Sequence, residues 1–210
     1  MNGPLPPPLV LACAALARDL RAVLGADGLD HHIEVEYLPA NLHNRPDRIV
    51  PELRPRIEAA VHERRAVFVA YADCGTGGAL DALLRDFPNV ERLPGAHCYE
   101  VFAGAEAFAA LQDEELGTFY LTDFLTRHFD ALVWCGLGLD RHPSLRDAYF
   151  GAYRRVVLLS QSPDAALVAQ AQAAATRLGL TFEHRPTGRD RLRAPLLANI
   201  FEQATHAAAR

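Results

Sequence analysis

One stretch of the chain, residues 67–81, constrains the fold more than any other. It reads VFVAYADCGTGGALD, so a short apolar run rich in β-branched and aromatic residues is followed by glycines and then by leucines at helical spacing. A strand, a tight loop and a helix in this order form the repeating unit of an α/β fold. In a parallel sheet such a loop lies at the carboxyl edge, where ligands usually bind. We therefore expect Cys74 at that edge.

The same alternation of strand and helix continues through the rest of the chain. Repeated units of this kind, joined by right-handed crossovers, predict an open, mostly parallel sheet with helices on both faces, a three-layer arrangement like Rossmann or flavodoxin folds. We expect residues 9–210 to form a single α/β domain after a loose, proline-rich segment at residues 1–8. The patterns predict a strand that begins at residue 67 and further strands at residues 8–12, 32–38, 90–93, 118–122, 131–134, 156–160 and 181–184.

Composition and charge exclude several classes of protein. The 210 residues contain no apolar run long enough to cross a bilayer, and the start lacks the basic region of a signal peptide, so we expect a cytoplasmic protein without a membrane partner. The net charge of −5 argues against a nucleic-acid partner. All 21 basic residues are Arg, which leaves no lysine for a Schiff base or a P-loop.

Cysteine and histidine residues form the strongest chemical pattern in the chain. Because parallel strands share one carboxyl edge, residues that follow different strands meet there even when they are far apart in sequence. We expect Leu11, Val69, Val133, Val157 and Leu158 to lie in one such sheet. The Cys and His residues that each follow a predicted strand are Cys13, His43, Cys74, His97, Cys98 and Cys135.

The favoured site is a metal centre at this edge, formed by Cys13, Cys74 and Cys98 with His43 or His97. Thiolates and imidazole suit zinc, and thiolates also suit an iron–sulfur cluster. If three protein ligands bind, an open position remains at which a thiol, a water or a methyl acceptor is activated. The alternative is that the cysteines only pack in the core, since free Cys is among the most buried residue types.

Five segments resemble the signature blocks of a known family. They are LVLAC at 9–13, LPANLHNRP at 38–46, YADCGTG at 71–77, LPGAHC at 93–98 and GTFYLT at 117–122. The family that they resemble is DUF1638, a bacterial and archaeal domain of unknown function, and the resemblance runs over roughly residues 9–160. Cys135 matches none of the blocks. Related sequences have His-Asp-Cys where this chain has Ala96-His97-Cys98, so Cys98 matches the family better than His97 does.

This resemblance implies a role in one-carbon metabolism. Members of the family are often encoded beside corrinoid-dependent methyltransferases, which implies a protein acting in, or accessory to, corrinoid-linked methyl transfer. A corrinoid protein or a methyltransferase is the implied partner, and a corrinoid would then be carried by that partner. If the chain is itself an enzyme, it is expected to be a methyl- or one-carbon-group transferase.

The glycine-rich loop supports a second hypothesis. Asp73 and the glycines after it imitate the D-x-G-x-G start of a nucleotide or S-adenosylmethionine loop, which predicts a small-molecule cofactor bound by Gly75, Thr76, Gly77 and Gly78. Such a loop normally follows the first strand, whereas here it follows the third. A third hypothesis is a non-catalytic partner protein whose cysteines are purely structural.

Overall fold

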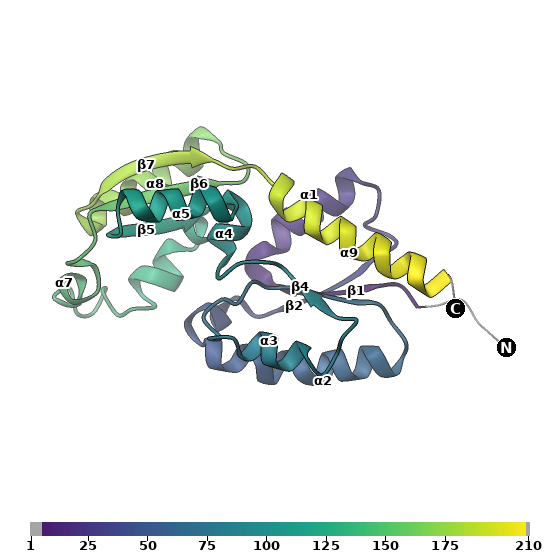
Figure 1. Ribbon diagram of the computed structural model, residues 1–210. Coiled ribbons are helices and arrows are strands. Elements are labelled where there is room, and N and C mark those ends of the chain that lie inside the picture. Colours follow the sequence, from purple (N-terminus) through teal and green to yellow (C-terminus); the bar gives the residue numbers. More distant parts are fainter. Residues whose placement is uncertain (1–5, 209–210) are drawn as a thin grey trace. The chain divides into compact units, whose positions relative to one another are not determined.

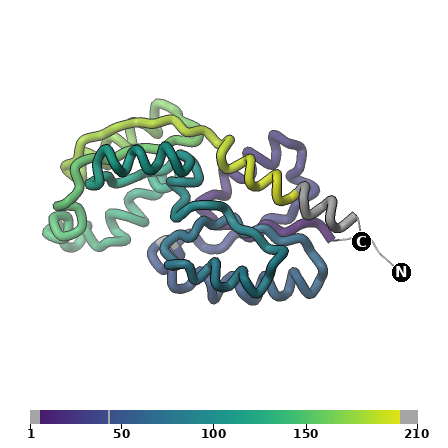
Figure 2. Tube along the Cα trace, in the orientation of Figure 1, coloured from purple at the N-terminus to yellow at the C-terminus, as the bar shows by residue number. Residues whose placement is uncertain are grey.

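The computed structural model describes residues 6–208, of which residue 43 and residues 201–208 are described in their backbone only. Contacts between residues group the chain into two compact units. The first unit comprises the described residues up to Val101 and those from Arg189 onward, and the second comprises Phe102–Gly188. The trace in Figure 2 enters the second unit after residue 101 and returns to the first at residue 189. The expectation that residues 9–210 form a single domain stays a prediction.

The helices and strands follow in chain order, with η denoting 3-10 helices and, for η4, a π-helix. Within residues 6–101 and at the end of the chain they are β1 (Leu9–Cys13), η1 (Ala14–Leu16), α1 (Ala17–Ala26), β2 (Glu34–Leu38), η2 (Ala40–Asn44), η3 (Pro46–Arg48), α2 (Ile49–His62), β3 (Val67–Ala70), α3 (Ala79–Leu84), β4 (Glu91–Arg92), α4 (Cys98–Ala103, continuing into the second unit) and α9 (Asp190–Ala208). The second unit contains α5 (Ala105–Glu114), β5 (Thr118–Thr122), α6 (Asp123–Arg127), η4 (Asp130–Trp134), α7 (Leu145–Phe150), β6 (Arg155–Ser160), α8 (Ala165–Leu178) and β7 (Thr181–Pro186).

The first unit is built on a four-stranded parallel sheet in the order β2-β1-β3-β4. Every residue of the central strands β1 and β3 is buried, which is typical of parallel strands covered on both faces. Figure 1 shows α1 and α9 over one face of this sheet and α2 and α3 over the other. The carboxyl ends of β1 and β3 lie side by side, because Ala12 pairs with Ala70.

The second unit is built on a three-stranded parallel sheet in the order β5-β6-β7. Adjacent residues of β5 contact helices on opposite faces, as the two-residue period of a strand requires. Phe119 meets Phe150 of α7 edge-on at 5.2 Å between ring centroids, whereas Tyr120 meets Phe108 of α5 at 4.9 Å. Both faces of the sheet are therefore covered by helices.

The predicted fold class is confirmed, with two corrections. The chain is an α/β protein with all-parallel sheets between helices, but its strands form two sheets instead of one. Val157 and Leu158 lie in β6 and therefore do not share a sheet with Leu11 and Val69, and Val133 lies in no strand. Residues 131–134 were expected to form a strand, yet they lie in the π-helix η4, where the Cys135 N–H donates to the Asp130 carbonyl at 2.7 Å. A four-residue apolar run has no periodicity that separates a strand from a buried helical turn.

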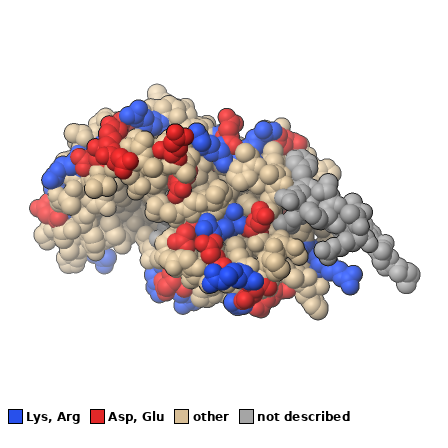
Figure 3. Space-filling view, viewed as in Figure 1, with Lys and Arg blue, Asp and Glu red and all other residues tan. Residues whose placement is uncertain are grey.

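The charges on the surface and the length and hydropathy of the helices are relevant to the nucleic-acid and membrane partners considered above. On the face seen in Figure 3, the side chains of Arg and of Asp and Glu are interspersed. The absence of a nucleic-acid partner, inferred from the acidic net charge, stays a prediction. Among the described residues, no helix is both long enough and apolar enough to cross a membrane.

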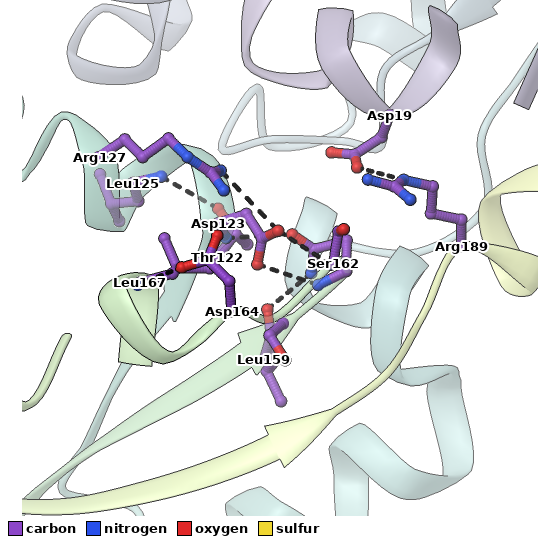
Figure 4. A network of polar contacts seen from close by, with 12 residues as sticks. Asp19, Thr122, Asp123, Leu125, Arg127, Leu159, Ser162, Asp164, Leu167 and Arg189 are labelled. Atoms are coloured by element: carbon purple, nitrogen blue, oxygen red, sulfur yellow. Dashed lines mark hydrogen bonds and ion pairs between the residues drawn. The ribbon is translucent and has the colours of Figure 1, made fainter. Parts of the chain in front are cut away.

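A buried carboxylate connects the carboxyl ends of β5 and β6. The Asp123 residue is 2% exposed, and its side chain accepts hydrogen bonds from the backbone N–H groups of Gln161 at 3.0 Å and Ser162 at 2.9 Å. The side-chain oxygen of Gln161 in turn accepts the Asp123 N–H at 3.1 Å. Arg127 lies 3.8 Å from the same carboxylate. Figure 4 shows how this network holds the chain between β6 and α8.

We expect Asp123→Ala to lower the free energy of unfolding by about 3 kcal/mol, because two buried N–H groups lose their acceptor. Urea unfolding followed by the fluorescence of Trp134, the single tryptophan of the chain, reports on the second unit. Asp147→Ala is the matched control, since that side chain is 79% exposed and pairs with its neighbour Arg146; it should cost less than about 1 kcal/mol. Equal losses in the two variants would contradict the role of the network.

Candidate functional site

Three of the four cysteines line one small cavity at the carboxyl edge of the first sheet. Cys13 ends β1, Cys74 lies in the loop after β3, and Cys98 begins α4 after β4. The cavity has a volume of about 10 Å³, which is room for about one water-sized group. All the residues that line it belong to the first unit. Besides the cysteines they are Ala15, Leu16, Ala70, Tyr71, Ala72, Leu93 and Val101.

Backbone hydrogen bonds hold the loop after β3 against the loop after β4. The Asp73 N–H donates to the Gly95 carbonyl at 3.1 Å, and the Cys74 N–H donates to the Ala96 carbonyl at 2.8 Å. The Glu100 carboxylate accepts the Ala96 N–H at 2.7 Å. Glu100 therefore supports the loop backbone in this structure. These contacts place Cys74 close to the beginning of α4.

The backbone at Cys74 has an unusual conformation. Its φ of 51° lies in the left-handed region, which costs a residue with a Cβ atom roughly 1–2 kcal/mol. The hydrogen bond from its N–H to Ala96 helps to hold this conformation. Non-glycine residues in sparsely populated backbone regions concentrate at functional sites, so the strain marks the Cys74 loop as a place where geometry matters.

Burial keeps the three thiols in their neutral form. The pKa of Cys74 is raised to about 12, first by burial and then by the neighbouring Cys13. Burial, followed by Cys74 and Cys13, raises the pKa of Cys98 well above its ordinary value. The pKa of Cys13 is also raised by burial, although hydrogen bonds from the Ala15 backbone and the Tyr71 hydroxyl lower it in part. A nearby positive charge, such as a metal ion, is needed to stabilise the thiolates.

Tyr71 is a cavity residue that the sequence analysis missed. It directly follows β3 and is 2% exposed. Its hydroxyl is fully buried and faces the Cys13 thiol, which acts on it as a hydrogen-bond partner. Burial and then the adjacent Cys13 raise the pKa of this hydroxyl. An aromatic residue that follows an apolar strand is typical of a core, so the residue type gives no signal of a polar function.

The other predicted ligands are not on the cavity wall or are not described. The side chain of His43 lies outside the described residues, so its role stays a prediction. His97 precedes α4 and its carbonyl accepts the N–H groups of Glu100 and Val101 at 3.1 and 3.2 Å, but it does not line the cavity. Cys135, which was expected at the same sheet edge but not as a ligand, is exposed and belongs to the second unit.

The three thiols do not form a ready-made metal site. Among the described residues there is no group of three or more Cys, His, Asp or Glu side chains arranged to hold a metal ion. The sulfurs of Cys13, Cys74 and Cys98 share a cavity wall as neutral thiols, so an ion would have to draw the side chains inward as they lose their protons.

The glycine-rich loop is occupied by its own aspartate. The Asp73 carboxylate accepts hydrogen bonds from the N–H groups of Gly77 at 3.0 Å and Gly78 at 2.9 Å and from the Thr76 hydroxyl at 2.5 Å. Burial acts to raise the pKa of Asp73, but these hydrogen bonds outweigh it and the pKa is lowered. An anionic cofactor at the same N–H groups would meet this charged carboxylate. Cofactor binding by Gly75 and its neighbours stays a prediction, and the geometry counts against it.

Comparison with known proteins identifies a family. The family model described as "Protein of unknown function (DUF1638)" matches residues 37–196. The match begins later than the resemblance seen in the sequence segments and extends beyond Ser160. It includes Tyr71, Cys74 and Cys98 and leaves out Cys13. No curated protein and no solved structure matches the chain.

The raised pKa values predict slow and pH-dependent alkylation of the cavity thiols. At pH 8 in the presence of a chelator, Cys74 should react with iodoacetamide at least about 100-fold more slowly than the exposed Cys135, because it is protonated and half-buried. Its rate should rise with pH up to about pH 12, as the thiolate forms. Peptide mass spectrometry measures both rates in one sample. Equal rates at pH 8 would show that Cys74 is not shielded from the reagent and that its pKa is not raised.

Proposed function

Since the chain belongs to the DUF1638 family, whose description names no reaction, we propose its function from the site itself. We propose that Cys13, Cys74 and Cys98 bind one zinc ion, or alternatively an iron–sulfur cluster, and that this centre serves one-carbon transfer. The supporting observation is that three of the four cysteines, from three separate strand ends, line one cavity of about 10 Å³.

The chemistry of the wall favours a soft metal ion. Mg²⁺ and Ca²⁺ need carboxylate and carbonyl oxygens, whereas the side chains on this wall offer three sulfurs and one phenol hydroxyl among apolar groups. Zinc binds thiolates well and takes the place of the protons that burial now holds on the sulfurs. Because the metal must displace these protons, its affinity should rise with pH.

The proposed role in methyl transfer follows from the number of thiols. If Cys13, Cys74 and Cys98 held zinc, its fourth position would be open, and the metal would supply Lewis-acid activation of a thiol there as the nucleophile for a methyl group. The resemblance to a family encoded beside corrinoid-dependent methyltransferases supports the same chemistry. A cavity of about 10 Å³ is far too small for a corrinoid, so that cofactor would be carried by a partner, either a corrinoid protein or a methyltransferase.

Metal analysis tests this proposal. We expect protein purified without chelators, or reconstituted with Zn²⁺, to contain about one zinc per chain by mass spectrometry of the elements. Cys74→Ser and Cys98→Ser should each lose the metal, because a hydroxyl is a poor substitute for a soft anionic ligand. Cys135→Ser is the matched control and should keep it, since Cys135 is exposed and lies in the second unit.

Two results would contradict the proposal. One is wild-type protein that takes up no stoichiometric metal even on reconstitution, and the other is Cys74→Ser protein that keeps its metal in full. Either result would mean that the cysteines only pack against the cavity wall. Far-UV circular dichroism of each variant separates the loss of a ligand from the loss of the fold.

A further inference from the structure

The sulfur of Cys74 lies against the backbone of Cys98. It accepts a hydrogen bond from the Cys98 N–H, and the Cys74 N–H donates to the Ala96 carbonyl at 2.8 Å. These contacts hold the loop after β3 on the beginning of α4. Of the other two cavity thiols, that of Cys74 acts on the Cys98 thiol more strongly than that of Cys13 does. Folding therefore makes the thiols of Cys74 and Cys98 close neighbours.

The thiol of Cys13 has other partners. It forms hydrogen bonds with the Ala15 backbone and the Tyr71 hydroxyl, and Cys13 is 4% exposed. Cys74, in contrast, is partly exposed and precedes the exposed Gly75, so a solute can approach its sulfur from this loop. The cavity thus has one thiol held in the core and a pair of thiols carried by the loops.

We infer that Cys74 and Cys98 form a disulfide when the chain meets a low-molecular-weight disulfide, and that Cys13 stays a thiol. This inference goes beyond the proposed function, because it concerns the metal-free chain and holds whether or not the cysteines bind zinc. It assigns a site of reversible oxidation to the pair. Oxidation uses up two of the three thiols of the proposed metal centre, so the oxidised chain would not hold a metal there.

The oxidation takes place in two exchange steps. The Cys74 sulfur attacks one sulfur of the small disulfide, the bond between the two small sulfurs breaks, and one small thiol leaves with the Cys74 proton. The Cys98 sulfur then attacks the Cys74 sulfur, the protein disulfide forms, and the second small thiol leaves with the Cys98 proton. The two cysteines lose two electrons in total, and the small disulfide gains them.

The fold favours the second step over a lasting mixed disulfide. Because the backbone at Asp73 and Cys74 is already bonded to the loop before α4, joining the sulfurs costs little further chain entropy, and each thiol is at a high effective concentration near the other. The cavity gives the side chains free space into which to turn. Since burial keeps the thiols neutral and the exchange slow, the equilibrium is the quantity to measure.

Peptide mapping of the wild-type chain tests the inference. Metal-free protein is equilibrated with reduced and oxidised glutathione in the presence of a chelator and without oxygen, free thiols are blocked with N-ethylmaleimide, and the chain is cleaved after arginine. The four cysteines then lie on four peptides, residues 1–18, 66–85, 93–127 and 128–141, so each pairing has its own mass.

The expected product joins peptide 66–85 to peptide 93–127. At a fixed concentration of reduced glutathione, it should be half-formed with about tenfold less oxidised glutathione than half-modifies the exposed Cys135, because Cys135 has no neighbouring thiol to displace the glutathione. Reduction with dithiothreitol should return both peptides to the thiol form.

Cysteine variants separate the pair from the other thiols. Cys13→Ser should form the same linked peptide with the same amount of oxidised glutathione, whereas Cys98→Ser should leave Cys74 as a thiol or a glutathione adduct. Cys135→Ser is the matched control for removal of a cysteine outside the cavity and should not change the linked peptide. Far-UV circular dichroism shows whether each variant is folded, and the wild-type map decides on its own if Cys13→Ser is not.

Two results would overturn the inference. One is a linked peptide that joins Cys13 to Cys74 or to Cys98, and the other is a chain in which Cys74 and Cys135 form only glutathione adducts. The outcome is independent of metal analysis. Protein that takes up no zinc but forms the Cys74–Cys98 disulfide contradicts the proposed function alone, and zinc-binding protein whose metal-free form gives no such disulfide contradicts this inference alone.

Discussion

Two backbone hydrogen bonds between the loops after β3 and β4 determine where the thiols meet. The N–H groups of Asp73 and Cys74 donate to the carbonyls of Gly95 and Ala96, which continues the pairing of the two strands beyond their ends. Arg92 adds to this, since its guanidinium donates to the Gly95 carbonyl at 3.1 Å. Strand β4 is only two residues long, so these contacts, and not the strand, hold most of the segment between β4 and α4 in place. The cavity depends on them.

The burial that brings the thiols together also opposes their ionisation. A pKa of about 12 for Cys74 means that the metal-free site is a set of neutral, weakly nucleophilic groups at physiological pH. The left-handed backbone at Cys74 adds a local cost to the same loop. The raised pKa values are the ordinary consequence of burying neutral thiols, whereas the left-handed backbone at Cys74 is a cost that packing alone does not require.

Much of the fold was predictable, because β1, β3 and β6 are buried apolar runs between amphipathic helices. The meeting of Cys13, Cys74 and Cys98 was also predictable, since parallel strands share one carboxyl edge. Strand pairing was not, because local patterns do not encode which strands become neighbours. Val133 was misplaced because four apolar residues have no distinguishing period, and Tyr71 was missed because an aromatic residue after a strand is usually part of the core.

The first unit is discontinuous in the chain, and its last helix is supplied after the whole of the second unit. Helix α9 contacts β3, and Arg189 pairs with the buried Asp19 at 2.7 Å, as Figure 4 shows. During synthesis every residue of the second unit is therefore made before the first unit receives α9, the second of the two helices on that face. The second unit can fold from contiguous residues, whereas one face of the β2-β1-β3-β4 sheet is completed only by the residues from Arg189 onward.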